Sequence, residues 1–341
     1  MFYKKSVWLK AKMNDFELSV ITDPIPVGLF SITEGIKALL RTIRKVGRSF
    51  FNPVPAYLLS DYRGHPAVTR SIVQGLEKLN VPFNYNPKVI NDLSQTVVVL
   101  SGISALRQMI KFKQQGYIRR LLIGPNIMDG SGSNRDVFAS PEVDRYITHA
   151  PVCPFVSRLI PTLALRCVPW AAGVDLRFWY PETIRTRDLV LIYNKQNTGT
   201  TVSLEPYRTV LMRRGYKVSI LEYGSYTVED YRSVLQRSKF MVGFTRNETQ
   251  GIAFAEAWAC DVPTFIWSNS EPTMFGVAYG GSNAPYLTDA TGASFSDVDD
   301  FTKLLSRWDR DGFNFKPRQW CRENMSDEIC ARALLTIAQS I

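Results

Sequence analysis

Hydrophobic residues along the chain fall into short apolar runs that alternate with stretches of helical periodicity. The runs are rich in Val, Ile and Leu and have the length of buried strands; they lie at 96–100, 120–123, 189–193, 217–221 and 240–244. After most of them, apolar residues recur every three or four positions, which predicts a helix. Strands that alternate with helices in this way indicate an α/β fold with parallel, doubly wound sheets.

In the first half the pattern begins at 56–60, which we expect to be the first core strand. A glycine-containing turn, a helix at 67–79 and a short strand at 83–85 follow, and this order is the opening unit of a Rossmann-like domain. The G-x-G-x-x-G of dinucleotide-binding proteins is absent. Residues 1–50 would then precede the first core strand as an extension.

Within that extension, 31–48 carries apolar residues on one face and Lys and Arg around it, which predicts a basic amphipathic helix. Such a helix either packs on its own domain or lies on an anionic membrane surface. The pattern leaves both interpretations open.

The second half repeats the alternation, and a polar loop follows each of its first three strands. Open α/β sheets bind ligands beyond the carboxyl ends of their strands. We therefore expect the loops at 194–200, 222–227 and 245–251 to converge on a site.

Composition narrows the class of protein. A length of 341 residues allows two domains, and no apolar run reaches the roughly eighteen residues of a membrane span or resembles a signal peptide. The five cysteines show no C-x-x-C pair and no Cys/His metal spacing, so we expect reduced thiols of a cytoplasmic protein and no metal site. The sequence contains only two histidines, which makes a His-based catalytic triad a poor fit.

A net charge of +10 calls for an acidic partner. Nucleic acid, an anionic membrane surface and a diphosphate-bearing substrate all meet that description. The Lys and Arg residues are spread out, with no zinc-finger spacing, no RNP-type aromatic motif and no dense basic tail, which argues against nucleic acid.

The segment 239–267 is predicted to be strand, polar turn, helix and strand, with a carboxylate on each side of the helix start. Glu248 lies in the turn before Gly251, and Glu256 lies in the Ala-rich helix 252–259. Eight helical residues rise about 12 Å in slightly more than two turns, so both carboxylates should lie on roughly the same side. A helix N-terminus binds phosphate and carboxylates bind hydroxyls, which a sugar nucleotide combines. Two glutamates at this spacing also occur by chance.

The order of these residues resembles the E-x7-E segment of retaining GT-B glycosyltransferases of family 4. The family pattern is E-[ST]-x-G-x-x-x-x-E-A-x-A-x-G-x-P, which is followed by Glu248-Thr249-Gln250-Gly251 and then by 256–263. Asp261 stands where the family usually has glycine, and aspartate tolerates a left-handed turn. Residues 168–181 similarly resemble the family's linker between two domains, with one extra residue. The resemblance covers the second half well and the first half in outline.

The resemblance implies a donor site for a nucleoside diphosphate sugar. Glu256 would bind the ribose hydroxyls, Glu248 the hydroxyls of the transferred sugar, and the N–H groups of Gly251 and Ile252 the phosphate. Thr249 and Gln250, in the same turn, would also belong to the donor-binding site. UDP- and GDP-linked sugars both fit this description, and no other cofactor is implied.

Five further residues complete the expected site. Lys195, with Arg246 as a second cation, would neutralise the leaving diphosphate, although a loop lysine is often simply solvated. The loop after 217–221 could frame the base through Tyr223 and Ser225, or its tyrosines could pack locally. By resemblance, Gly64 and His65 match the family's glycine loop, so His65 would contact the transferred sugar or the acceptor; otherwise it is a turn residue.

The implied fold is GT-B: two Rossmann-like doubly wound domains face a central cleft, and a C-terminal helix crosses back to the first domain. The expected boundaries are 1–50 for the extension, 51–180 for the acceptor-side domain, 181–316 for the donor domain and 317–341 for the crossing helix. The implied function is metal-independent transfer of a sugar to a hydroxyl of a glycan, lipid or protein-linked acceptor, with retention of configuration. The enzyme would be cytoplasmic, with peripheral contact to an anionic membrane left open.

Two other classes of protein remain as alternatives. A sugar-nucleotide epimerase of the same architecture would need several acid/base groups, for which two histidines are few. A non-catalytic sugar-binding or nucleic-acid-binding protein would have no need of Glu248 and Glu256. The sequence does not indicate the donor sugar, the acceptor or the oligomeric state.

Overall fold

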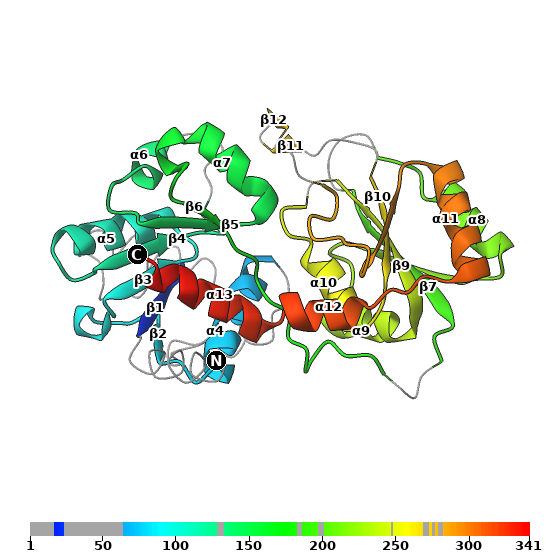
Figure 1. Ribbon diagram of the computed structural model, residues 1–341, viewed down its shortest axis with the longest axis horizontal. Helices are drawn as coiled ribbons and strands as arrows, with labels where there is room; N and C mark the ends of the chain where they lie inside the picture. The colour runs from blue at the N-terminus through cyan, green and yellow to red at the C-terminus, as the bar shows by residue number, and fades with distance from the viewer. Residues whose placement is uncertain are drawn as a thin grey trace, which may run out of the picture. The chain divides into compact units, whose positions relative to one another are not determined.

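A computed structural model describes residues 17–23, 64–127, 133–182, 186–196, 201–246, 248–268, 273–274, 277–278 and 282–341. They form two compact units (Figure 1). Unit 1 takes the described residues up to Gly173 together with Asp327–Ile341, and unit 2 runs from Val174 to Ser326. None of the helices in this described part is both long enough and apolar enough to cross a membrane.

Unit 1 is built on a six-stranded sheet with the order β2-β1-β3-β4-β5-β6, and every neighbouring pair is parallel. Its strands are β1 (Leu18–Ile21), β2 (Phe83–Tyr85), β3 (Thr96–Val99), β4 (Arg120–Ile123), β5 (Arg145–Thr148) and β6 (Cys167–Pro169). Strands β1, β3 and β4 lie inside the sheet and are almost fully buried. This agrees with the expectation that apolar β-rich runs form buried parallel strands.

The helices of unit 1 are α4 (Gly64–Lys78), α5 (Ile103–Gln114), α6 (Arg135–Phe138), α7 (Cys153–Leu159) and α13 (Asp327–Gln339). Short 3-10 turns lie at Ile90–Asp92, Ala150–Val152 and Pro161–Leu163. Helix α5 packs on β3 and β4, α7 packs on β6, and α13 lies along α4 (Figure 1). The last helix of the chain therefore belongs to the first unit.

Helices α4 and α13 approach each other closely because α4 carries a glycine at the contact. A Cβ on Gly75 would lie 2.4 Å from the carbonyl oxygen of Asp327 and 2.6 Å from Cβ of Ala331. Beside it, Arg70 of α4 is bonded to Asp327 at 3.2 Å, and these side chains are 2% and 0% exposed. Lys78 reaches the same carboxylate oxygen at 3.2 Å. A buried ion cluster thus fixes α13 to α4.

The expectation that residues 1–50 precede the first core strand is wrong, because Leu18–Ile21 is β1 and lies between β2 and β3. This run is only four residues long and contains Ser19, whose buried hydroxyl donates to Oγ of Ser94 at 3.1 Å. The short edge strand β6 was also missed. The strand expected at 56–60 and the amphipathic helix expected at 31–48 lie outside the described residues.

Unit 2 contains a five-stranded parallel sheet with the order β13-β10-β9-β7-β8. Its strands are β7 (Leu189–Lys195), β8 (Lys217–Glu222), β9 (Ser238–Thr245), β10 (Thr264–Trp267) and β13 (Gly292–Phe295). A two-residue hairpin pairs β11 (Thr273–Met274) with β12 (Val277–Ala278). Because β7 lies between β8 and β9, the ends of these three strands are neighbours.

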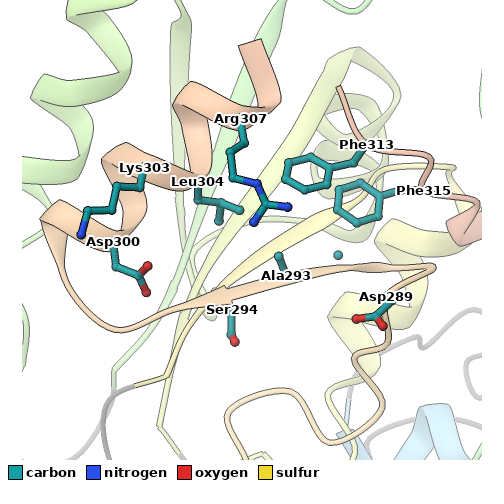
Figure 2. A pocket seen from close by; sticks show the side chains of 10 residues that line it. Asp289, Ala293, Ser294, Asp300, Lys303, Leu304, Arg307, Phe313 and Phe315 are labelled. Carbon is teal, nitrogen blue, oxygen red and sulfur yellow. The ribbon is translucent and has the colours of Figure 1, made fainter. Parts of the chain in front are cut away.

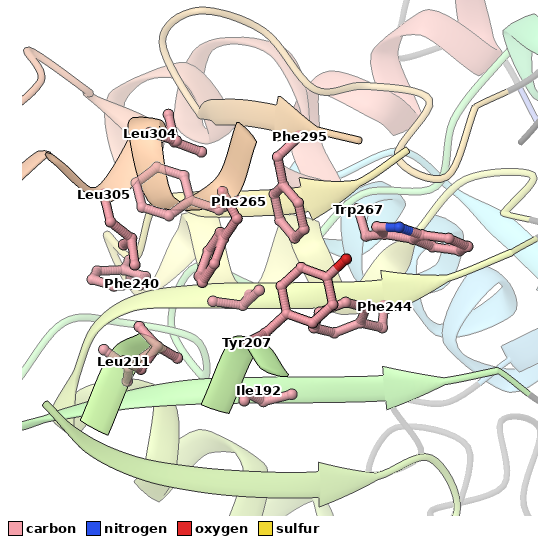
Figure 3. Close-up of a cluster of buried hydrophobic side chains, with 13 residues drawn as sticks. Ile192, Tyr207, Leu211, Phe240, Phe244, Phe265, Trp267, Phe295, Leu304 and Leu305 are labelled. Atoms are coloured by element: carbon pink, nitrogen blue, oxygen red, sulfur yellow. The ribbon is translucent and has the colours of Figure 1, made fainter. Parts of the chain in front are cut away.

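The helices of unit 2 are α8 (Glu205–Arg213), α9 (Val228–Arg237), α10 (Ile252–Ala259), α11 (Val298–Asp311) and α12 (Pro317–Asn324). Helices α8 and α11 pack against each other and cover one face of the sheet, where a cluster of buried apolar side chains lies (Figure 3). In it, Tyr207 of α8 contacts Phe244 of β9 edge-on, with ring centroids 4.9 Å apart. Helices α9 and α10 pack on β7, β9 and β10.

The crossing helix expected over 317–341 is two helices, α12 and α13. The break falls at Met325 and Ser326: Met325 has φ −142° and ψ 23°, and Ser326 forms a bridge to Val174. The backbone N–H of Val174 donates to the carbonyl of Met325 at 2.9 Å. Neither glycine nor proline marks the break in the sequence, so the apolar periodicity conceals it.

Candidate functional site

The carboxyl edge of the unit 2 sheet carries the expected donor-site residues. Lys195 is the last residue of β7 and pairs in register with Thr245, the last residue of β9. Tyr223 directly follows β8, and its backbone N–H donates to the carbonyl of Asn194 at 2.8 Å. Parallel strands end at one edge, so these loops meet there, as the alternation of strands and helices predicted.

An ion pair connects the loops after β7 and β9. The Nζ atom of Lys195 lies 2.8 Å from Oε1 of Glu248, and the two side chains are 28% and 10% exposed. The same ammonium lies 4.7 Å from the ring centroid of Tyr223, a cation–π distance. Glu248 also pairs with Ser282 as an isolated antiparallel bridge. The pair is therefore held by three separate segments of the chain.

Because this ion pair is largely buried, removal of one partner alone costs free energy: the other charge is left in the interior without its counter-ion. A carboxylate removed from water needs a cation or hydrogen-bond donors, because leaving it unpaired costs several kcal/mol in the interior. Lys195 supplies the cation from the end of a rigid central strand. Its ammonium retains partial access to solvent, so a soluble anion can reach it.

The turn after Glu248 presents the start of α10. Gly251 is the N-cap residue with φ 76° and ψ 53°, a left-handed conformation that glycine adopts without steric cost. Among the described residues, none accepts a hydrogen bond from the backbone N–H of Gly251, Ile252 or Ala253. Unpaired donors at a helix N-terminus form an anion-binding site.

We expect Gly251→Ala to weaken this anion site and lower stability. The left-handed backbone costs a residue with a Cβ about 1–2 kcal/mol, and the new methyl would lie 2.9 Å from Cδ2 of Phe254. Relief of that contact would turn the Gly251 and Ile252 N–H groups away from their present direction. Isothermal titration with UDP and GDP, together with thermal unfolding, measures both effects. Gly215→Ala is the control, because Gly215 also has positive φ but open space around it and lies outside the site.

Glu256 lies in α10 and is 5% exposed. Its neighbours include Tyr231 of α9 and Cys260: burial first, and then the charge of Glu256, raise the pKa of both groups. Burial is also the main cause of the raised pKa of Tyr193 in β7, and the charge of Glu248 raises that pKa further. The rings of Tyr193 and Tyr231 are 5.8 Å apart. The two carboxylates therefore flank one cluster of tyrosines.

Arg246 follows β9 and lies beside β10. Its Cζ atom is 5.7 Å from the ring centroid of Trp267, and its buried Nε atom has no hydrogen-bond partner. Nearby, the Nδ2 amide of Asn283 donates to the Trp267 carbonyl at 2.6 Å, and the Thr245 hydroxyl donates to the Asn283 carbonyl at 2.7 Å. Lys195 ends β7 and Arg246 follows the adjacent strand β9. No ion pair of Arg246 is found among the described residues.

The remaining expected residues lie as follows. Ser225 is in the turn after β8, where its hydroxyl donates to the carbonyl of Glu222 at 2.7 Å. Thr249 is half-buried and Gln250 is buried, both in the turn before α10. His65 belongs to unit 1, in the first turn of α4, where its carbonyl accepts from Thr69 at 3.4 Å. It is therefore a helical residue and not a turn residue.

Several residues that shape the loops were not anticipated. The amide of Asn194 donates to Oε2 of Glu222 at 2.8 Å and joins the ends of β7 and β8. Gln196 accepts from the backbone N–H of Val202 at 2.7 Å and returns a bond to the Val202 carbonyl at 3.1 Å, so it closes the loop after β7. Polar residues at the carboxyl end of a buried strand were the available signal for both.

A cavity of about 540 Å³ lies elsewhere in unit 2, along the edge strand β13 (Figure 2). It contains none of the expected donor-site residues. Figure 2 shows Arg307 of α11 beside the rings of Phe313 and Phe315, with Asp300 and Lys303 on the same helix. The donor-site residues at the carboxyl edge are therefore separate from this cavity.

No family model matches the sequence, and no curated protein matches it. Solved structures do match the fold. HepE from Anabaena, in a complex with UDP, aligns with a TM-score of 0.54 and 10% identity over 96% of this chain and 100% of that one. The apo form of the lipopolysaccharide outer core galactosyltransferase WaaB aligns with a TM-score of 0.54 and 11% identity, over 95% and 99% of the two chains. TarM aligns with a TM-score of 0.50 and 15% identity, over 80% and 58%.

These similarities extend over both units. The parallel sheets of six and five strands are the two α/β domains that the alternation of strands and helices predicted. The chain has the GT-B fold.

Proposed function

We propose that the protein transfers a sugar from a nucleoside diphosphate sugar to an acceptor hydroxyl, with retention of anomeric configuration. The observation that carries this proposal is the 2.8 Å ion pair of Lys195 and Glu248 beside the helix N-terminus at Gly251. This arrangement places a cation, unpaired N–H donors and a carboxylate at the carboxyl edge of one sheet. HepE was crystallised with UDP and with UDP and glucose, which supports a sugar nucleotide as the ligand class.

In the proposed mechanism, the diphosphate of the donor replaces Glu248 as the ion-pair partner of Lys195. Without donor, Glu248 neutralises the ammonium at 2.8 Å. A diphosphate brings more negative charge than one carboxylate and can also accept hydrogen bonds from the N–H groups of Gly251 and Ile252. Lys195 then moves toward phosphate, and Glu248 becomes free to accept hydrogen bonds from hydroxyls of the sugar.

Bond cleavage places negative charge on the departing diphosphate. The bond between the anomeric carbon and the diphosphate oxygen breaks, and its electron pair stays with the diphosphate. Lys195, Arg246 and the N-terminus of α10 stabilise that charge, which is the largest contribution that such a site makes. The acceptor oxygen attacks from the face that the diphosphate leaves, and its proton passes to the diphosphate. Retention then needs no nucleophilic side chain.

The rest of the donor extends toward α10 and the loop after β8. Glu256 is proposed to bind the ribose hydroxyls, and Tyr223, which is 41% exposed, to contact the base. Ser225 already donates its proton to Glu222, so its hydroxyl can act only as an acceptor. Thr249 and Gln250 support the turn. Because Lys195 and the helix N-terminus supply positive charge, we propose that no divalent ion is needed, and turnover should persist in EDTA.

The acceptor is proposed to be a hydroxyl of a glycan, a lipid or a protein-linked sugar. His65 is proposed to contact the transferred sugar or this acceptor. Replacement of His65 by alanine should then raise the KM for the acceptor more than the Kd for the nucleotide. Equal effects on both would contradict this assignment.

A panel of UDP- and GDP-sugars tests the function directly. We expect hydrolysis or transfer from one donor, with the anomeric configuration of the product retained in its proton NMR spectrum. Inversion of the product would refute the retaining mechanism, and release of an epimerised sugar nucleotide would indicate an epimerase. Binding without turnover, or donor-independent binding of nucleic acid, would favour the non-catalytic alternatives.

Glu256→Gln separates ribose binding from chemistry. The amide keeps the size of the side chain but loses the charge that accepts two ribose hydroxyls, so we expect the Kd for UDP to rise about tenfold, the cost of one charged hydrogen bond. Thermal unfolding should change little. The matched control is Glu229→Gln, an exposed glutamate of α9 outside the site. An unchanged Kd would remove Glu256 from the donor site.

A further inference from the structure

Two cysteines of unit 1 lie together, where a helix packs on an edge strand. Cys153 is the first residue of α7 and Cys167 is the first residue of β6, and α7 packs on β6. The Sγ atom of Cys167 lies 3.9 Å from the carbonyl oxygen of Cys153. Both side chains are half-buried, whereas Cys260, Cys321 and Cys330 are buried.

The two thiols also influence each other's pKa. A hydrogen bond from the Cys167 thiol is the main cause that lowers the pKa of Cys153, and the same bond raises the pKa of Cys167. Tyr146 of β5 lies against both: burial raises its pKa most, and Cys167 and Cys153 raise it further. Tyr146 pairs with Cys167 in the sheet, and its hydroxyl donates to the Ile127 carbonyl at 2.7 Å, which fixes the ring.

We propose that Cys153 and Cys167 are a reversible oxidation site that forms a disulfide when the protein meets a peroxide. The Sγ atom of Cys167 already lies 3.9 Å from the backbone of Cys153, and a disulfide requires the two sulfurs to come within about 2 Å of each other. The bond would join the start of α7 to an edge strand within unit 1, so no movement between units is required. Two partly accessible thiols on packed elements are an arrangement found in redox-sensitive sites.

The step is balanced with hydrogen peroxide as the oxidant. The Cys153 thiolate attacks one peroxide oxygen, the O–O bond breaks, and Cys153 becomes a sulfenic acid while the other oxygen leaves as water after protonation. The Cys167 sulfur then attacks the sulfenic sulfur; the S–O bond breaks, and the oxygen leaves as a second water that carries the Cys167 proton. Both thiols are oxidised, and one peroxide is reduced to two waters.

Peptide mapping of the full chain after treatment with one equivalent of hydrogen peroxide tests the proposal. We expect a peptide pair cross-linked through Cys153 and Cys167, with the mass of two hydrogens lost, and recovery of both thiols with dithiothreitol. In Cys167→Ser, Cys153 should accumulate as a sulfenic acid that dimedone traps. In Cys153→Ser, Cys167 should stay reduced under the same treatment.

Cys321→Ser is the control, because its thiol is buried in unit 2 against the Ala255 carbonyl at 3.7 Å. It should form the Cys153–Cys167 disulfide at the wild-type rate. Absence of the cross-linked peptide, or faster oxidation of one of the three buried cysteines, would overturn the proposal. The readout is a mass and needs no sugar donor, so it is independent of the proposed transferase activity.

Discussion

Lys195→Ala should lower kcat for sugar transfer by about 10²–10³-fold, the usual cost of losing one preorganised group that stabilises charge in a transition state. In the free protein Lys195 lies 2.8 Å from Glu248, and its strand fixes its position. Negative charge on the diphosphate beside Lys195 increases as the diphosphate leaves. The loss of Lys195 should therefore lower mainly kcat. Lys195→Arg should recover part of the rate because it keeps the charge. Steady-state kinetics with saturating donor measure kcat for the wild type, Lys195→Ala and Lys195→Arg.

The matched control is Lys217→Ala. Lys217 is the first residue of β8, at the opposite edge of the same sheet, and pairs with Asp188 at 3.4 Å while 75% exposed. Its removal should leave kcat within about twofold, as for most surface substitutions. Thermal unfolding of both variants shows whether the loss of the Lys195 ammonium beside the buried Glu248 carboxylate destabilises unit 2. Equal losses of kcat in the two variants would mean that Lys195 acts through stability alone.

The strands and helices of unit 2 could be predicted because local pattern and tertiary environment agree there. Helix α10 has the predicted bounds, since Gly251 begins it and Asp261, at φ 58°, follows its end. Strand β1 could not be predicted in this way. Its burial comes from β2 and β3, which are more than sixty residues away in the chain, and four residues give no measurable period.

The candidate site could be predicted in part. Its location followed from the rule that ligands bind at the carboxyl ends of parallel strands, and Lys195 and Glu248 do meet there. The contact between Arg246 and Trp267 could not be foreseen, because it depends on which strands are neighbours in the sheet. The pairing of Glu248 with Ser282 likewise joins segments that are far apart in the sequence, and no local pattern predicts it.

Asp327→Ala should lower the stability of unit 1 by about 3–5 kcal/mol, the cost of removing one partner of a buried ion pair. Asp327 is fully buried at the start of α13, and its loss leaves the guanidinium of Arg70, 2% exposed, without its carboxylate. Lys78, which is 12% exposed, would lose the same partner. Amide hydrogen exchange in peptides from α4 and α13, followed by mass spectrometry, measures the change in unit 1 separately from unit 2.

The double substitution Arg70→Met with Asp327→Leu distinguishes a lost charge partner from lost packing. Replacement of both ions by apolar side chains removes their desolvation cost, so the double variant should be more stable than Asp327→Ala. Asp136→Ala is the control in the same unit, because its pair with Arg107 is exposed at 3.8 Å and should contribute less than about 1 kcal/mol. If the double variant were as unstable as the sum of its single substitutions, the attachment of α13 to α4 would depend on packing at Gly75 and not on charge.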